Sequence, residues 1–164
     1  MRAYISIGSN QDTDTNVRAA IAALRAQFGS VPCSGIYETP AVGFSGAPFL
    51  NLVCAIDTPR TLEDVQAALR AIESALGRHR GEQKFAPRTI DLDLLTWGNV
   101  VAGRIPRDDI TQYDFVLGPL AELAGDERHP VLKRTYGELW AEMASRGYAL
   151  TPVAPARATR ILET

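Results

Sequence analysis

Features that would assign a chain of 164 residues to a familiar class are scarce in this sequence. It has only two cysteines, Cys33 and Cys54, which are too few for a disulfide framework or a cysteine-rich zinc site. No apolar run approaches the roughly 20 residues that a membrane-spanning helix needs, and the first residues are typical of a strand rather than of a signal peptide. We therefore expect a cytoplasmic protein with no membrane partner, in which both cysteines are buried free thiols.

A large net charge and the common nucleotide-binding motifs are also missing. The formal net charge is −2 and the pI is about 5.7, which argues against nucleic-acid binding through bulk charge. Neither a glycine-rich loop ending in Lys-Ser or Lys-Thr nor a Gly-x-Gly-x-x-Gly motif is present, so a nucleotide would have to bind in another way. No repeat or linker-like tract divides the chain. We expect residues 1–164 to form a single monomeric domain that acts on small molecules.

The most informative stretch is acidic and runs from residue 90 to residue 95. Apolar and acidic residues alternate there, so in a strand Asp91 and Asp93 project from one face and the leucines from the other. Residues on the same face of a strand are roughly 6.5–7 Å apart, so both carboxylates can reach one metal ion or two neighbouring ions. Magnesium is usually held by one or two carboxylates together with substrate phosphates. The alternative is that the two acids form the solvated face of an edge strand.

A basic segment leads directly into this acidic stretch. Four cations fall within eleven residues, and two glycines accompany them: Arg78, Arg80, Lys84 and Arg88, with Gly77 and Gly81. Guanidinium and ammonium groups bind anionic oxygens, whereas a solvated edge strand does not explain why such a segment precedes the acids. Together the two stretches predict metal-dependent chemistry on a phosphorylated small molecule.

The rest of the pattern predicts an α+β fold. Strand-like segments occupy residues 2–7, 31–37, 49–56 and 89–97, and amphipathic helices occupy 14–28 and 61–76. The order β-α-β-β-α-β is that of a ferredoxin-like sheet with both helices on one face. For the C-terminal extension we expect a buried segment at 115–120, a short helix over 136–143, a final strand over 149–153 and a loosely held terminus over 152–159.

Three residues outside the acidic strand carry open alternatives. Residues 39–48 form a long loop rich in proline and glycine, and such loops are commonly functional. Phe49, which follows it, either contacts a ligand or plugs the core beneath the loop. Asn51 either hydrogen-bonds a heterocycle through its amide or caps a strand end. Glu73, near the end of the second helix, either orients an arginine or a ligand, or forms a surface ion pair.

Four stretches of the chain resemble the 6-hydroxymethyl-7,8-dihydropterin pyrophosphokinase family. They are residues 4–10, 37–40, 49–51 and 87–94, the last reading Pro-Arg-Thr-Ile-Asp-Leu-Asp-Leu. The similarity runs from about residue 4 to residue 97 and resumes at 115–120. The resemblance implies that ATP, a co-substrate, donates its pyrophosphoryl group to the hydroxymethyl group of the pterin and leaves as AMP, in folate biosynthesis.

The resemblance also implies roles for individual residues. Asp91 and Asp93 would hold two magnesium ions, and Asp93 would orient or deprotonate the attacking hydroxyl group. The catalytic residues would be Arg80, Arg88 and Asp93. The ATP contacts would be Glu73, Arg78, Arg80, Lys84, Phe85, Arg88, Leu94 and Arg107. The pterin contacts would be Thr39, Val42, Phe49, Asn51 and Phe115, with the two phenylalanines stacking on either side of the ring.

The chain departs from the family pattern between residues 99 and 114. Arg107 stands where the family has a histidine that contacts ATP, and Tyr113 stands where an arginine is expected. The segment from residue 99 to residue 106 is also shorter than in the family by several residues. Arg104 and Arg107 are the two candidates for supplying the missing positive charge. These departures leave three alternatives open: a paralogue acting on a modified pterin, a non-catalytic pterin- or nucleotide-binding module, and a generic metal-dependent phosphohydrolase.

Overall fold

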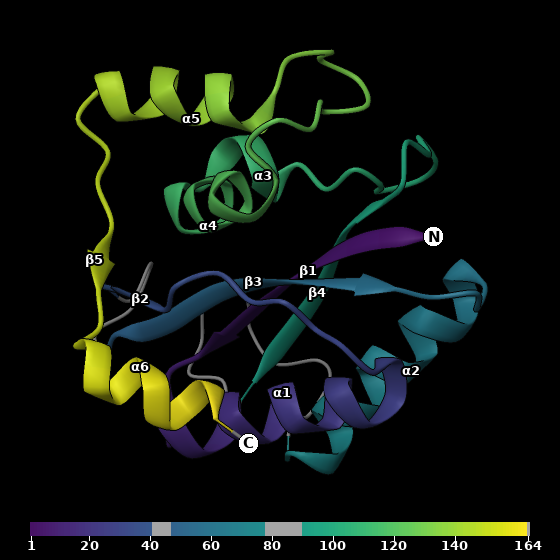
Figure 1. The fold of residues 1–164 in the computed structure, drawn as a ribbon, viewed down its shortest axis with the longest axis vertical. Coiled ribbons are helices and arrows are strands. Elements are labelled where there is room, and N and C mark those ends of the chain that lie inside the picture. Colours follow the sequence, from purple (N-terminus) through teal and green to yellow (C-terminus); the bar gives the residue numbers. More distant parts are fainter. Residues whose placement is uncertain (41–46, 78–89, 164) are drawn as a thin grey trace.

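The computed structural model describes residues 1–40, 47–77 and 90–163. At its centre is a five-stranded sheet with the strand order β4-β1-β3-β2-β5 (Figure 1). The strands are β1 (Arg2–Ser9), β2 (Tyr37–Thr39), β3 (Phe49–Asp57), β4 (Asp91–Trp97) and β5 (Thr151–Pro152). Neighbouring strands pair antiparallel throughout. The predicted α+β class and the β-α-β-β-α-β order are confirmed, and β5 extends the sheet at the edge formed by β2.

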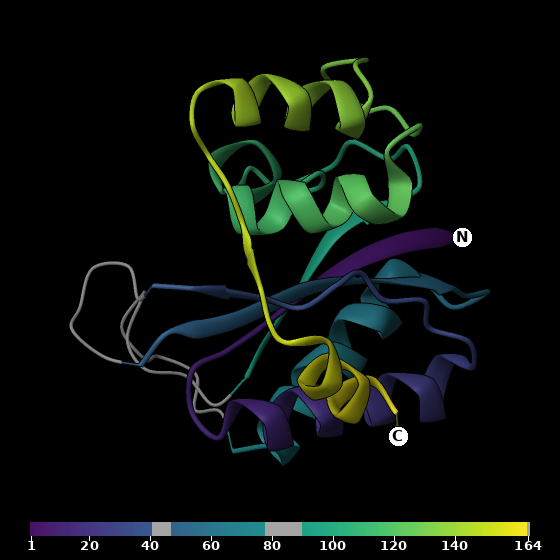
Figure 2. The same cartoon turned by 60° about the vertical axis from the view of Figure 1, so that its left-hand side comes forward.

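Helices cover both faces of the sheet. The helices are α1 (Thr13–Phe28), α2 (Leu62–Ala75), α3 (Asp109–Gln112), α4 (Asp114–Ala124), α5 (Tyr136–Ser145) and α6 (Pro155–Leu162). Helices α1 and α2 lie on one face, as predicted, and α6 lies beside α1 (Figure 1). Helices α3, α4 and α5 lie on the opposite face. The C-terminal segment passes the edge of the sheet from α5 to α6, and β5 lies on this crossing (Figure 2).

The alternation of side chains along the strands produces two cores. Ala3, Ile5 and Ile7 of β1 belong to a buried cluster with the apolar faces of α1 and α2. Tyr4, which points the other way, belongs to a second cluster with α4. Leu50, Leu52, Cys54 and Ile56 of β3 join the first cluster, and Val53 and Ala55 join the second. The sheet is therefore buried on both faces where α4 covers it.

The end of α2 and the start of β4 lie at positions that matter for the site. Helix α2 begins at a Thr61 cap, whose side chain accepts a hydrogen bond of 3.1 Å from the backbone N–H of Asp64. It ends at Ala75, and Gly77 then adopts a φ of +93°, a left-handed conformation that glycine tolerates best. The chain leaves α2 at this point and is described again at Ile90, directly before β4.

The predicted strand over residues 31–37 is largely wrong. Only Tyr37–Thr39 is regular strand. The preceding residues run beside β3 without a continuous ladder, held by bonds from Ser34 N–H to the Val53 carbonyl (2.8 Å) and from Ala55 N–H to the Pro32 carbonyl (2.9 Å). Proline has no N–H to donate, so this stretch cannot form a full strand pairing.

The prediction of a loosely held terminus over residues 152–159 is also wrong. Residues from Pro155 onward form α6, in which Ile161 is buried, and Arg157 makes an ion pair of 2.7 Å with Asp14 of α1. The helix over 136–143 and the buried segment at 115–120 are confirmed as α5 and as the inner side of α4. The strand over 149–153 is confirmed in shortened form as β5.

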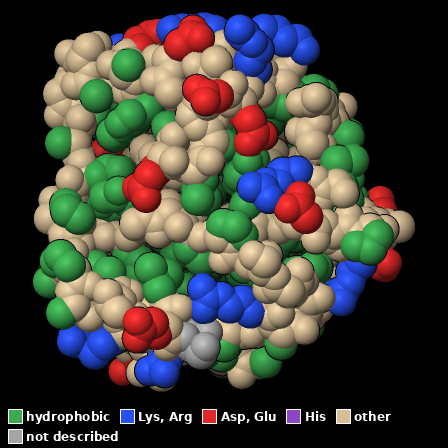
Figure 3. All heavy atoms as spheres, viewed as in Figure 1, with side chains coloured by type: hydrophobic (Ala, Val, Ile, Leu, Met, Phe, Trp, Pro, Cys, Tyr) green, Lys and Arg blue, Asp and Glu red, His purple; other side chains and the backbone are tan. Residues whose placement is uncertain are grey.

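The surface carries charges of both signs. On the face shown in Figure 3, Lys and Arg side chains lie among Asp and Glu side chains and form no large patch of one sign. This agrees with the small net charge of −2. Within the described ranges, no helix is both long enough and apolar enough to cross a membrane.

Candidate active site

Pairing across the sheet brings the two acids of β4 into line with a polar residue of β3. Asp91 pairs with Gly8 of β1, and Gly8 in turn pairs with Asn51 of β3. Residues directly opposite one another on neighbouring strands project from the same face. Asp91, Asp93 and Asn51 therefore share one face, and Gly8 between them carries no side chain.

That face is the one opposite α1 and α2. Leu92 and Leu94, which alternate with the acids, are buried in the cluster beneath those two helices, so Asp91 and Asp93 point to the other side. Both acids are half-buried. The predicted placement of both carboxylates on one face is confirmed. The side chain of Leu94 points away from the acids, so only its backbone is left for the expected contact with a nucleotide.

A buried carboxylate supports β4 between the two acids. Glu73, in the last turn of α2, is 3% exposed, and its Oε2 atom accepts a hydrogen bond of 2.9 Å from the backbone N–H of Leu92. The alternative of a surface ion pair is wrong, because Glu73 is buried. The helix periodicity placed Glu73 beside the apolar stripe, but its partner follows only from the packing of α2 against β4.

Burial and neighbouring acids raise the pKa of Asp93 to about 7. Loss of hydration is the largest cause and the charge of Asp91 the second. Arg107 opposes this shift, since its Nη1 atom lies 3.9 Å from Oδ1 of Asp93. Its Nη2 atom lies 3.4 Å from Oδ1 of Asp109. The Nε atom of Arg107 is buried with no hydrogen-bond partner among the residues that the structure describes.

This concentration of negative charge fits a hard divalent cation. Among the described residues, no group of three or more His, Cys, Asp or Glu side chains is arranged to enclose a metal ion. Magnesium does not need such a cage, because it usually keeps several waters and takes its remaining ligands from one or two carboxylates and a substrate. The donor set of Asp91 and Asp93 therefore suits magnesium bound together with a phosphorylated ligand.

We expect the metal-free protein to lose stability as the pH rises from about 4 to about 7. The pKa of Asp93 is about 7 in the folded state against 3.8 for an unperturbed aspartate, so in this window the folded state keeps a proton that the unfolded state releases. The free energy of unfolding should fall by on the order of 2 kcal/mol, allowing for solvent screening. Denaturant unfolding at pH 4.5 and pH 8 in the presence of a chelator measures the change.

Asp93→Asn should remove this part of the pH dependence, and Asp57→Asn serves as the matched control. Asp57 lies at the far end of β3, and its side chain is 68% exposed. The free energy of unfolding of the control should therefore change with pH as that of the wild type does. If that of Asp93→Asn did so as well, the buried charge on Asp93 would not be the cause.

Polar and aromatic side chains gather where β2 meets β3. The Nδ2 atom of Asn51 donates a hydrogen bond of 2.7 Å to Oγ1 of Thr39, and Phe49 lies directly opposite Thr39. A Cβ atom on Gly8 would lie 3.2 Å from Oδ1 of Asn51 and 3.9 Å from Cδ1 of Phe49. Asn51 lies inside β3, so its alternative role as a strand-end cap is wrong. Thr39, Phe49 and Asn51 are thus brought together beside Gly8, on the face that carries the acids.

The sequence match that decides the family spans most of this arrangement. A family model described as 7,8-dihydro-6-hydroxymethylpterin-pyrophosphokinase (HPPK) matches residues 4–125, which include β3, β4, α4 and most of β1. The chain belongs to the HPPK family.

Individual HPPK relatives agree with this assignment. The chain is 38% identical over 129 residues to the 2-amino-4-hydroxy-6-hydroxymethyldihydropteridine pyrophosphokinase of Bacillus subtilis (strain 168), covering 74% of this chain and 77% of the relative. It is 36% identical over 138 residues to the enzyme of the same name from Pseudomonas aeruginosa, covering 79% of this chain and 84% of the relative.

A solved structure shares the HPPK fold. The wild-type HPPK-DHPS of Plasmodium falciparum, solved with pteroate, superposes with a TM-score of 0.72 at 13% sequence identity. The match covers 88% of this chain but only 42% of that longer chain. At this level of identity the likeness concerns the fold alone.

An aromatic pair that the sequence did not predict lies where α4 begins. The rings of Tyr113 and Phe115 stack with their centroids 5.0 Å apart and an angle of 21° between their planes. In the sequence, Tyr113 stands out only as a departure from the HPPK pattern. Two aromatic residues two positions apart at the start of a helix do not predict stacking of their rings, because the stacking depends on how α3 leads into α4. Arg104 is exposed, whereas Arg107 contacts Asp93.

Several residues to which the HPPK resemblance assigns a role cannot be placed in the site described above. Six lie outside the described residues: Val42, Arg78, Arg80, Lys84, Phe85 and Arg88. Their expected roles in binding ATP or the pterin are therefore not tested by the arrangement above.

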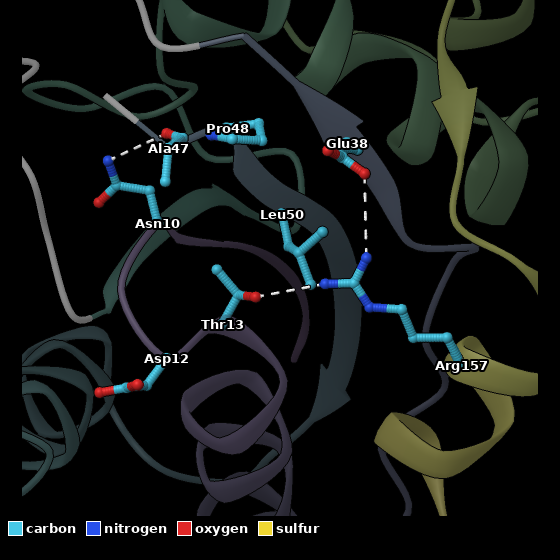
Figure 4. Close-up of a pocket in the computed structure, with 8 residues that line it drawn as sticks. All are labelled: Asn10, Asp12, Thr13, Glu38, Ala47, Pro48, Leu50 and Arg157. Carbon is cyan, nitrogen blue, oxygen red and sulfur yellow. Dashed lines mark hydrogen bonds and ion pairs between the residues drawn. The ribbon is translucent and has the colours of Figure 1, made fainter. Parts of the chain in front are cut away.

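A cavity of about 340 Å³ lies on a different side of the molecule. It is lined by Asn10, Asp12, Thr13, Glu38, Ala47, Pro48, Leu50 and Arg157, and Arg157 reaches across it from α6 (Figure 4). Glu38 and Leu50 alternate along their strands with Thr39 and Asn51, so they project from the α1 side of the sheet. This cavity is thus separated by the sheet from the face that carries Asp91 and Asp93.

Proposed function

We propose that this chain transfers the pyrophosphoryl group of ATP to the hydroxymethyl group of 6-hydroxymethyl-7,8-dihydropterin and releases AMP, a step of folate biosynthesis. The observation that carries the proposal is the alignment of Asp91 and Asp93 with Asn51 on one face of the sheet. It occurs within the part of the chain that matches the HPPK family. Relatives at 36% to 38% identity are named as this pyrophosphokinase.

Two magnesium ions would be held by Asp91 and Asp93, which lie side by side on β4. Bound there, they would neutralise charge on the triphosphate and favour ionisation of the attacking hydroxyl group. The chain's own contribution is to hold the two carboxylates in position. Glu73 does so from beneath, through its bond to the backbone of Leu92, and the pairing of β4 with β1 fixes the strand from the side.

Asp93 would orient the pterin hydroxyl group and accept its proton as the oxygen attacks the β-phosphorus of ATP in line. The new bond joins the pterin oxygen to this phosphorus. The bond from the β-phosphorus to the oxygen bridging it to the α-phosphorus breaks, and AMP leaves with that oxygen. Catalysis would then rest mainly on positioning and on neutralising the phosphate charges.

Arg107 would provide a fixed positive charge beside the metal-binding acids. It lies 3.9 Å from Asp93, and its buried Nε atom has no partner among the described residues. The Arg107 side chain is 26% exposed, so its terminal nitrogens can hydrogen-bond a phosphate oxygen. This would compensate for the histidine that the family usually has at this position, and the exposed Arg104 is not needed for it. Arg80 and Arg88 would stabilise the charge that develops during transfer, and Arg78, Lys84 and Phe85 would enclose the ATP.

The pterin would bind where β2 meets β3. Phe49 and Phe115 would stack on its two faces, Asn51 would hydrogen-bond its amide edge, and the backbone of Thr39 and Val42 would meet its remaining polar atoms. The 2.7 Å bond from Asn51 to Thr39 fixes the side-chain amide so that its oxygen faces the space above Gly8. Glycine at this position leaves room for a flat ring close to the acids.

The test is AMP formation by the purified protein in the presence of ATP, magnesium and the pterin alcohol. We expect AMP only when all three are present, together with a pterin diphosphate in equal amount. ATP turnover without the pterin would favour a phosphohydrolase, and binding without turnover would favour a non-catalytic module. Either result would contradict the proposal. Turnover only with other pterin alcohols would indicate a paralogue acting on a modified pterin.

Asn51→Ala should raise the KM for the pterin about tenfold, because it removes one well-placed hydrogen-bonding group worth about 1.4 kcal/mol. The KM for ATP should stay close to that of the wild type. Asn16→Ala is the matched control, since Asn16 also donates a side-chain hydrogen bond of 2.7 Å, to the carbonyl of Gln11, but belongs to α1 on the other face. Steady-state kinetics with each substrate varied in turn gives both constants. Equal changes for both substrates would count against a pterin-binding role.

A further inference from the structure

The two cysteines of the chain meet in the fold. The Sγ atoms of Cys33 and Cys54 lie 2.9 Å apart, although the residues are 21 positions apart in the sequence. Cys54 is fully buried in β3, whereas Cys33 is half-buried. Both are free thiols, as predicted, but the expected burial holds for Cys54 and is wrong for Cys33. Their proximity was not predicted. Nothing in the chemistry proposed above uses them.

The backbone around the two cysteines has the geometry of a cross-strand disulfide site. Cys33 and Cys54 form an antiparallel bridge, and the two flanking hydrogen bonds, Ser34 N–H to Val53 O and Ala55 N–H to Pro32 O, measure 2.8 and 2.9 Å. This pattern makes the cysteines a non-hydrogen-bonded pair, in which Cα atoms are typically about 4.5 Å apart. Disulfides span Cα distances of about 4.4–6.8 Å. A bond between the two sulfurs therefore requires no large movement of the backbone.

The surroundings of the two thiols differ in a way that assigns them different roles. The hydrogen bond from Cys54, aided by the nearby positive charge of Arg25, lowers the pKa of the Cys33 thiol. The same contact and complete burial raise the pKa of the Cys54 thiol. A thiolate is the nucleophile in thiol oxidation. Cys33, the more accessible of the two, is therefore the thiol that meets an oxidant, and Cys54 is placed to react with it afterwards.

We propose that Cys33 and Cys54 are a site of reversible oxidation, at which a peroxide converts the two thiols into an intramolecular disulfide. The sulfur of Cys33 attacks one oxygen of hydrogen peroxide, the O–O bond breaks, and one water leaves together with formation of a sulfenic acid. The sulfur of Cys54 then attacks the sulfur of Cys33, the S–O bond breaks, and a second water leaves. Both thiols are oxidised, and one peroxide is reduced to two waters.

The bond would connect residues 31–36 to β3 on the side of the sheet that faces α1. Cys54 belongs to the same buried cluster as Leu52 and Ile56. Along β3 these residues alternate with the ones on the face of the sheet that carries Asp91 and Asp93. The bond would close a loop that includes β2, and closing such a loop restricts the unfolded chain. Oxidation should therefore stabilise the fold without reaching the face that carries Asp91 and Asp93.

The test treats the reduced wild-type protein with hydrogen peroxide and then alkylates the denatured protein with iodoacetamide. Intact-mass measurement should show a species lighter by two hydrogens that takes up no alkyl group, stays monomeric on a non-reducing gel, and regains both thiols with dithiothreitol. The Tm should rise by about 5 °C. Two alkylatable thiols after treatment, a stable added oxygen, or dimers linked between chains would overturn the proposal.

Two variants separate the roles of the cysteines. Cys54→Ala should leave Cys33 to form a sulfenic acid that dimedone traps, and Cys33→Ser should leave the buried Cys54 unmodified. Neither variant should gain Tm on treatment with peroxide. A gain in either would show that the stabilisation does not come from the disulfide. If Cys54→Ala does not fold, the wild-type mass measurement still decides the outcome.

Discussion

Asp91→Asn and Asp93→Asn should each reduce pterin-dependent AMP formation by about three orders of magnitude or more. Each change removes one of the two carboxylates that the chain directs to the open face of β4, and electrostatic stabilisation of a transferring phosphoryl group is commonly the largest part of catalysis. An amide has a similar shape but carries no charge to hold a divalent cation. Initial rates of AMP release at saturating ATP and pterin measure the loss.

The matched control for the two acids is Asp57→Asn, a change of the same kind at an exposed position. Asp57 pairs with Arg2 on the surface at the other end of β3, so its loss should leave the rate within about twofold of the wild type. Thermal unfolding distinguishes lost chemistry from lost folding. The metal-free Asp93→Asn protein should be at least as stable as the wild type at pH 8, because it no longer buries a charge beside Asp91. A variant at Asp91 or Asp93 that kept more than a tenth of the wild-type rate would contradict this role.

Glu73→Ala should lower the rate of AMP release about 10- to 100-fold, although it changes neither Asp91 nor Asp93. Glu73 is buried, and it accepts a bond from the backbone N–H of Leu92, which lies between Asp91 and Asp93. Groups that support metal ligands typically have effects of this size. The loss of this acceptor should also reduce the free energy of unfolding by about 1–3 kcal/mol. Denaturant unfolding and the magnesium dependence of the rate are the two measurements.

Glu73→Gln distinguishes a positioning role from a direct one. Glutamine keeps an oxygen that accepts the bond from Leu92, so it should restore the stability and most of the rate. Glu63→Ala, on the exposed side of the same helix, should change the stability by less than about 1 kcal/mol and leave the rate unaltered. If Glu73→Gln were as slow as Glu73→Ala while folding normally, the charge of Glu73 would act on the ligand itself.

Structural features that follow from a short repeat of apolar and polar residues could be predicted from the sequence. The alternation around Asp91 and Asp93 has a period of two, and this period alone decides that both carboxylates share a face. The apolar spacing in residues 14–28 and 61–76 likewise predicted α1 and α2. These features depend on neighbours along the chain, and the structure confirms them.

Features that depend on contacts between distant elements could not be predicted in this way. The burial of Glu73 follows from the packing of α2 on β4, and the proximity of Cys33 to Cys54 follows from the register of residues 31–36 beside β3. The sequence does not predict helix α6, because an Ala- and Pro-rich composition gives little sign that Ile161 packs against α1. Arg107 was one of two candidates for the missing positive charge, and only the fold brings it within 3.9 Å of Asp93.

The most direct test of the central claim follows the β-phosphorus of ATP during turnover. ATP labelled at this atom is incubated with the protein, magnesium and 6-hydroxymethyl-7,8-dihydropterin, and the products are separated. Transfer of a pyrophosphoryl group predicts that the label appears in the pterin product, attached through the hydroxymethyl oxygen, and that the AMP is unlabelled. Label in ADP or in free pyrophosphate would contradict the account, because the first indicates transfer of the γ-phosphoryl group and the second indicates attack by water.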